Sequence, residues 1–267
     1  MVEVAAWIPF VVAGFAVGLV VGLTGVGGGS LMTPLLIFGF GIKPHLAIGT
    51  DLLFAAFTKL GGTASLARKR MVDWRVVSQV AAGSIPATLA TLYFLKLAGP
   101  ANPATQSLMT TTLGAALLLT AAATLYKAIR GKAVPLHIAQ DQLGQATTAR
   151  HWSLPIIFGA VIGVLVTLTS VGAGAIGVIV LMLLYPALPL PRIVAADIAH
   201  AVPLTLVAGL GHASIGSVDW PLLAKLLAGS LPGIYLGTYL MYKTPDRIIR
   251  SLLSVLLAYA GFKLIVI

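Results

Sequence analysis

Long apolar stretches of the kind that cross membranes fill most of this chain. Ten of them occur, at about residues 8–24, 29–42, 46–66, 75–97, 106–127, 154–171, 174–187, 192–213, 221–242 and 248–266. Hydrophobic residues make up 58% of the sequence and charged residues 9%, and the mean hydropathy is +1.01. Soluble proteins are about half apolar and a quarter charged, so the pattern predicts an all-α polytopic membrane protein in contact with the lipid bilayer.

The Lys and Arg residues of the chain are distributed in a way that indicates its orientation in the membrane. The 17 Lys and Arg against 7 Asp and Glu give a formal net charge of +10. Most of the Lys and Arg gather in short clusters between apolar stretches, which orient a membrane protein, and we therefore expect no nucleic-acid partner. The first ten residues contain no Lys or Arg and no small-residue cleavage site follows, so we expect the first stretch to be retained.

The chain contains a duplicated unit of five apolar stretches. The segment GFAVGLVVGLTGVGGG from Gly14 aligns with GAVIGVLVTLTSVGAG from Gly159 at an offset of 145, with 8 of 16 positions identical. DWRVVSQVAAGSIPA from Asp73 aligns with DWPLLAKLLAGSLPG from Asp219 at an offset of 146. The duplication divides the chain into three parts: a first transmembrane repeat at 1–128, a cytoplasmic linker at 129–152 and a second transmembrane repeat at 153–267.

The two repeats are predicted to be inverted in the membrane. The loop ARKRMVDWR from Ala67 is rich in Arg and Lys, whereas its counterpart SIGSVDWP from Ser214 contains neither. Because Lys and Arg mark cytoplasmic loops, the two loops should lie on opposite faces. Each repeat then crosses the membrane an odd number of times, and both termini are external.

A glycine cluster interrupts the start of each repeat. The stretch GLTGVGGGSLMTP from Gly22 to Pro34 places five glycines in eight residues. The apolar segments before and after it, about 17 and 14 residues, reach about 25 and 21 Å, short of the 30 Å hydrocarbon core. They predict a re-entrant helical hairpin. Close helix packing through Gly14, Gly18 and Gly22 is the alternative explanation.

The glycine turns are candidate anion sites. A glycine-rich turn that opens a helix offers backbone N–H groups and a positive dipole end, and two such turns could meet near the membrane midplane. The candidate substrate-binding residues are Thr24, Gly25, Gly27, Gly28, Gly29 and Ser30 of the first repeat, Thr169, Ser170, Gly172 and Gly174 of the second, and Lys59 as a balancing cation.

Ionisable residues inside apolar stretches are further candidates, because each costs free energy in hydrocarbon. Asp51 and Asp197 occupy equivalent positions, and His200 follows Asp197 by one turn. We take these three as candidate coupling residues, with helix-start or interfacial placement as the alternative for both aspartates. His45 is expected at the solvated interface and His212 at the surface.

These motifs resemble a known family. The pair LTGVGGGSLMTPLL and SVGAGAIGVIVLMLL, with HLAIGTDLLFAAFTKLGGT and the repeated DW, AGS and P, is similar to the TauE/SafE sulfite exporter family of bacterial permeases. The resemblance covers about residues 8–265. It implies a multi-pass secondary transporter in the bacterial inner membrane, for small sulfur-containing anions such as sulfite, thiosulfate or organosulfonates. In the second repeat Ser170 replaces Gly25 and Ala173 replaces Gly28, a departure from an exactly symmetric site.

Other functions find less support in the sequence. It contains no HExxH, GxSxG or Walker motif, so we expect no enzyme activity, no cofactor and no metal centre. A cation or metal-ion permease that uses Asp51, Asp197 and His200 is the main alternative. The sequence leaves the transported anion, the direction, the coupling ion and the oligomeric state open.

Overall fold

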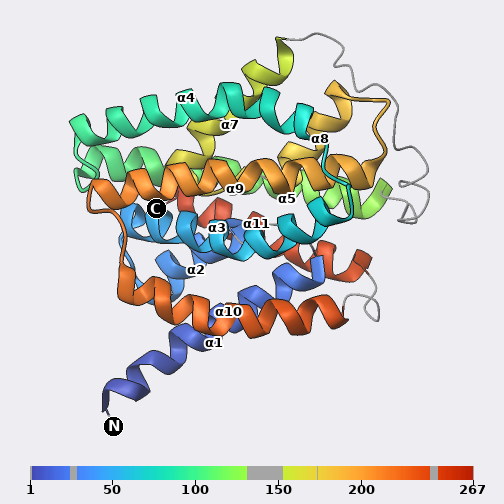
Figure 1. Cartoon of the computed structure of the whole chain (residues 1–267). Coiled ribbons are helices and arrows are strands. Elements are labelled where there is room, and N and C mark those ends of the chain that lie inside the picture. Colours follow the sequence, from blue (N-terminus) through green and yellow to red (C-terminus); the bar gives the residue numbers. More distant parts are fainter. Residues whose placement is uncertain (1, 25–28, 131–152, 173, 241–245, 267) are drawn as a thin grey trace.

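The computed structural model describes residues 2–24, 29–130, 153–172, 174–240 and 246–266, and these residues form ten helices and no strand (Figure 1). The helices are α1 (Val2–Thr24), α2 (Gly29–Phe40), α3 (Pro44–Arg68), α4 (Trp74–Ala98), α5 (Pro103–Arg130), α7 (Leu154–Thr169), α8 (Ala175–Leu184), α9 (Leu190–Ser214), α10 (Trp220–Leu240) and α11 (Asp246–Val266). Each predicted stretch corresponds to one helix, which confirms the all-α prediction.

The helices differ in whether they can cross a membrane alone. Among the described residues, Trp74–Ala98, Pro103–Tyr126 and Leu190–Ser214 are long and apolar enough to do so. By contrast, α2 has 12 residues and α8 has 10, which at 1.5 Å per residue is about 18 and 15 Å. The two short helices follow the glycine turns at equivalent places in the two repeats.

Asp73 and Asp219 lie at the starts of equivalent helices. Asp73 is the N-cap of α4 and accepts hydrogen bonds from the backbone N–H groups of Arg75 and Val76 at 3.1 and 3.4 Å. The side chain of Asp219 accepts one from the Leu222 N–H at 2.9 Å. These bonds satisfy N–H groups that have no partner within the helix.

The helices of the two repeats are interleaved. The first helix of each repeat packs along the fourth helix of the other, α1 on α10 and α7 on α4, while α3 packs on α9 and α5 on α11. In Figure 1, α3 and α9 lie between α4 on one side and the α1–α10 pair on the other. The centre of the bundle is therefore built from the third helix of each repeat.

Glycines bring α1 and α10 into close contact. Three glycines of α1 face carbonyl oxygens of α10 that are one helical turn apart. Gly14 faces the Leu226 oxygen, Gly18 the Ser230 oxygen and Gly22 the Ile234 oxygen. At Gly18 and Gly22 an added Cβ would lie only 2.5 Å from the oxygen. The close-packing role predicted for these glycines is confirmed, and the order of the contacts makes α1 and α10 parallel.

The central helices α3 and α9 run antiparallel. Gly49 near the start of α3 faces His212 near the end of α9, whereas Gly209 faces Leu53, one turn further along α3. Because α3 and α9 are equivalent in the duplication, two copies of the same element lie side by side in opposite directions.

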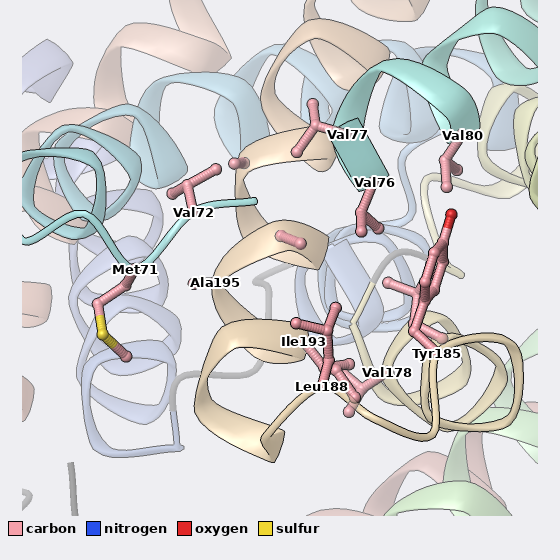
Figure 2. Packing of buried hydrophobic residues seen from close by; sticks show 13 residues of the cluster. Met71, Val72, Val76, Val77, Val80, Val178, Tyr185, Leu188, Ile193 and Ala195 are labelled. Carbon is pink, nitrogen blue, oxygen red and sulfur yellow. The ribbon is translucent and has the colours of Figure 1, made fainter. Parts of the chain in front are cut away.

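An apolar cluster fixes the end of the bundle where α4 begins. Figure 2 shows Val76 and Val80 of α4, Val178 of α8 and Ile193 of α9 converging on one another, with Tyr185 beside them. All five residues are buried. The short helix α8 is thus held between the two repeats.

Candidate functional site

Four of the candidate residues are buried ionisable side chains on the two central helices. Asp51 and Lys59 belong to α3, and Asp197 and His200 to α9. Their exposed fractions are 0%, 8%, 4% and 4% in that order. The helix-start or interfacial placement considered for the aspartates does not apply, because both lie inside the bundle. We call these four residues the central charge cluster.

Asp51 of α3 faces α2 and the turn that follows α7. The Thr33 hydroxyl of α2 donates a short hydrogen bond to one carboxylate oxygen of Asp51. The other oxygen, Oδ1, has no hydrogen-bond partner in the described chain. The Ser170 hydroxyl, at the turn after α7, approaches the carboxylate without completing a hydrogen bond. Asp51 therefore lies between helix α2 of one repeat and the glycine turn of the other.

Lys59 interacts with both carboxylates of the cluster. Its ammonium group is attracted to Asp197 and, less strongly, to Asp51. Lys59 follows Asp51 by eight residues, or about 12 Å along the helix, which explains why the stronger attraction comes from Asp197 of α9. The charge of Lys59 also acts on His200. The Nε2 of His200 lies 2.8 Å from the Ser84 Oγ of α4.

Asp197 lies against the first turn of α8. One carboxylate oxygen occupies the place that a side chain on Gly177 would need. The N-cap of α8 is Gly174, which provides no side-chain hydrogen bond to the first N–H groups of the helix. A carboxylate beside a helix N-terminus is stabilised by the positive end of the helix dipole. The same environment suits a bound anion.

Three described residues of the second-repeat turn have positive φ. Ser170 is left-handed with φ 60°, and Gly172 and Gly174 have φ values of 134° and 136°, which glycine adopts readily. Thr169 is fully buried, and its Oγ1 lies 2.6 Å from the Leu165 carbonyl oxygen. The same Oγ1 accepts a hydrogen bond from the Val171 N–H at 3.1 Å, which holds the turn in this conformation.

The first-repeat turn is described only in part. Gly25, Gly27 and Gly28 lie outside the described residues, as does the side chain of Thr24. Helix α2 begins at Gly29, and Ser30 in its first turn is buried.

The predicted exposure of two histidines was wrong. His212, expected at the surface, is fully buried, and its Nε2 lies 2.9 Å from the Thr167 carbonyl oxygen of α7. His45, expected at the solvated interface, is 7% exposed and interacts with Gln106 of α5. A helix end is a poor predictor of exposure when a neighbouring helix covers it.

Other buried polar contacts were not predicted. Ser84, the partner of His200, comes from the repeated AGS motif, so the duplication carried a signal for it. Thr33 is completely buried, and the sequence around it contains no signal for its contact with Asp51. Arg192 and Asp73 form an ion pair at 3.4 Å where α4 and α9 begin. In the part of the chain that the structure describes, no three His, Asp or Glu residues are grouped to hold a metal ion.

Known proteins are similar to this chain over nearly its whole length. The model of the sulfite exporter TauE/SafE family matches residues 10–264. The chain belongs to this family. The match spans both repeats and therefore includes every residue of the central charge cluster.

Curated relatives are similar over nearly their full length. The probable membrane transporter protein YjnA of Bacillus subtilis (strain 168) is 36% identical over 258 residues, 97% of this chain and 99% of the relative. YdhB of the same strain, also named a probable membrane transporter protein, is 28% identical, covering 94% and 97% of the two chains. No solved structure matches the chain. This TauE/SafE member is therefore a membrane transporter.

Proposed function

We propose that the protein is a secondary transporter for small sulfur-containing anions such as sulfite, thiosulfate or organosulfonates. Its family is described as that of sulfite exporters, which supports a sulfur oxyanion as the cargo. The sequence contains no nucleotide-binding motif, which supports an ion gradient as the energy source.

Lys59 carries this proposal. It is a buried cation on a central helix, and it interacts electrostatically with the carboxylates of Asp197 and Asp51. A buried charge requires a partner of opposite sign, and its two partners lie on different helices. An anion that enters between α3 and α9 can replace either carboxylate as the partner of Lys59. The positive end of α8 lies beside the same place and adds to the attraction.

The glycine turns supply the remaining donors of the proposed site. An oxyanion needs several hydrogen bonds, and the first N–H groups of α8, which receive none from the side chain of their N-cap residue Gly174, could donate to it directly. Ser170, Gly172 and Gly174 place those groups in the second repeat. In the first repeat we propose the same role for Thr24, Gly25, Gly27, Gly28, Gly29 and Ser30. Thr169 contributes by holding its turn rather than as a direct donor.

The charge balance of the cluster supports coupling to protons. With both carboxylates ionised, Asp51, Asp197 and Lys59 sum to one negative charge, which repels an anion. Protonation of one carboxylate removes that charge and releases Lys59 for the substrate. We therefore propose Asp51 and Asp197 as the coupling residues, with His200 beside Lys59 as a further proton site.

A cation permease is the weaker alternative. Such a carrier should bring Asp51, Asp197 and His200 together in one shell of oxygen and nitrogen ligands. Against this, the positive charge of Lys59 interacts with both carboxylates and would repel a cation bound to them. The Nε2 of His200 is engaged by Ser84.

We also propose that the two repeats, 1–128 and 153–267, are inverted about an axis in the membrane plane. The antiparallel contacts of α3 with α9 support this arrangement, because the two helices are equivalent copies. The charged loop of Arg68–Arg70 and the linker 129–152 would then face the cytoplasm, and both termini the outside. Since α1 packs on α10 and α4 on α7, the bodies that move in alternating access would each combine helices from both repeats.

An uptake assay with several substrates tests the proposed function. Purified protein in proteoliposomes should accumulate ³⁵S-labelled sulfite, thiosulfate or a small sulfonate when the outside is acidic. Protein-free liposomes give the background, and Mn²⁺ and Zn²⁺ represent the cation alternative. Uptake of a metal ion without uptake of any sulfur anion would refute the proposal and favour the cation permease.

A further inference from the structure

A line of buried polar side chains leads away from the central charge cluster along α4, α7 and α9. It starts at His200 and continues toward the end of the bundle where α3 begins and α9 ends. We call it the polar seam, and its members are Ser84, Thr88, Thr167, His212 and His45. The first four have no exposed surface, and His45 is 7% exposed.

The inner half of the seam connects His200 to the α4–α7 interface. The His200 Nε2 lies 2.8 Å from the Ser84 Oγ. Thr88 follows Ser84 by one helical turn, about 6 Å, a gap that one water molecule can bridge. The Thr167 hydroxyl of α7 lies 3.2 Å from the Thr88 hydroxyl, and both hydroxyls also face the Gly163 carbonyl oxygen.

The outer half of the seam ends at two histidines. The His212 Nε2 lies 2.9 Å from the Thr167 carbonyl oxygen, and His45 of α3 is close enough to His212 for an electrostatic interaction. His45 in turn interacts with Gln106, a partly exposed residue of α5. The Nδ1 atoms of both histidines and the nearby Ser217 Oγ have no hydrogen-bond partner in the described chain. Buried polar atoms of this kind bind ordered water.

The duplication provides an internal comparison, because each seam residue has a counterpart in the other repeat. The counterparts are Phe54 for His200, Ser230 for Ser84, Ile234 for Thr88, Gly22 for Thr167, Leu66 for His212 and Pro191 for His45. One of the six is polar. The helix pair α1–α10 thus packs without the seam that α4–α7 contains, so helix packing does not require the polar residues. Burying polar groups inside a membrane protein costs free energy, so we infer that the polar residues of the seam have a role other than helix packing.

We propose that the polar seam is a hydrated proton path that connects the central charge cluster to one face of the membrane, the face where α3 begins. This inference rests on the proposed function, in which that face is external. A proton from external water would pass His45 and His212, follow the hydroxyls of Thr167, Thr88 and Ser84, and end on the Asp197 carboxylate by way of His200. The carboxylate becomes a neutral acid, and Lys59 is then free for the anion.

The charged and titratable groups around the path fit this direction. At its outer end His212 faces His45 of α3, together with neutral Thr167 of α7. At its inner end His200 faces Lys59 of α3 and Ser84 of α4. His200 lies close to the Lys59 cation, and Asp197, three residues before His200 on α9, is the carboxylate that would accept the proton. Of the two carboxylates of the central charge cluster, Asp197 is on the same helix as His200, and it is therefore the endpoint of the proposed path.

Two flux measurements in proteoliposomes separate the seam from the anion site. A pH-sensitive dye in the lumen reports proton influx during sulfite uptake, whereas counterflow of labelled against unlabelled sulfite requires no net proton movement. Ser84→Ala and Thr167→Val should each reduce proton influx at least tenfold and leave counterflow within twofold of the wild type. The matched controls are Ser230→Ala, the counterpart of Ser84, and Thr120→Val, a buried threonine bonded to its own helix. Both controls should retain both fluxes.

Water in the seam can be tested without any substrate. Brief hydroxyl-radical labelling marks buried side chains that contact ordered water, so His212 should be labelled although its exposed fraction is 0%, and Phe54, equally buried, should not be. If His212 is labelled but no sulfite counterflow occurs, the proposed transport of sulfite is refuted, while the proposal that the seam contains water is supported. The seam is refuted if His212 and Phe54 are both unlabelled. Wild-type proton influx in Ser84→Ala and Thr167→Val, or an equal loss of counterflow, refutes the proton path.

Discussion

The Asp197 carboxylate occupies the space beside Gly177 that any larger residue would fill. This contact connects α9 to the first turn of α8 and keeps a negative charge at the positive end of a helix. It also limits what position 177 can be, since only glycine leaves room for the carboxylate.

We expect Gly177→Ala to impair transport more than folding. The added Cβ must displace the carboxylate from α8, at a cost of about 1–3 kcal/mol in stability. Sulfite uptake should fall at least tenfold, while size-exclusion profiles show normal amounts of folded protein. The control is Gly61→Ala, because no atom lies within 4 Å of the Cβ position at Gly61. Wild-type uptake by Gly177→Ala would show that the Asp197 position is unimportant.

Thr33 and Asp51 should be coupled energetically. The Thr33 hydroxyl is the hydrogen-bond donor to a completely buried carboxylate, so Thr33→Val should lower stability by about 1–3 kcal/mol. Asp51→Asn changes the same contact, and the double variant should therefore lose less stability than the two single losses together. Unfolding of all four proteins in detergent measures this difference. Strictly additive losses would argue against the contact.

The orientation of the loops can be tested by cysteine labelling, since the native chain contains no cysteine. Lys69 and Ser214 lie exposed in equivalent regions of the two repeats. In the inverted arrangement, a membrane-impermeant maleimide added to intact cells should label Ser214→Cys and should label Lys69→Cys only after lysis. Labelling of both from the same face would reject the inverted repeats.

The sequence predicted the helices well and their packing poorly. Apolar length and glycine breaks are local signals, and they located α2 and α8 to within three residues at each end. Helices α1 and α7 each pack on a helix of the other repeat. This packing depends on contacts such as that of Gly14 with Leu226, about two hundred positions apart, and a single sequence offers no signal for such contacts.

The candidate site was predicted in part for the same reason. Buried charge identified Asp51, Lys59, Asp197 and His200, because ionisable residues are rare in apolar stretches. It gave no indication that Asp197 of the other repeat would attract Lys59 more strongly than Asp51 of its own helix does. His212 was missed because its partner, the Thr167 carbonyl oxygen, belongs to a helix in a distant part of the sequence.

Ligand-dependent thermal stability of Lys59→Gln tests the account most directly. A ligand at 100 times its Kd adds about 2.7 kcal/mol to the stability of the folded protein. Sulfite, or the sulfur anion that the uptake assay identifies, should therefore raise the unfolding temperature of the wild type and of Lys96→Gln, whose side chain is exposed near the end of α4. It should leave the unfolding temperature of Lys59→Gln unchanged. An equal increase in Lys59→Gln would contradict an anion site built around Lys59.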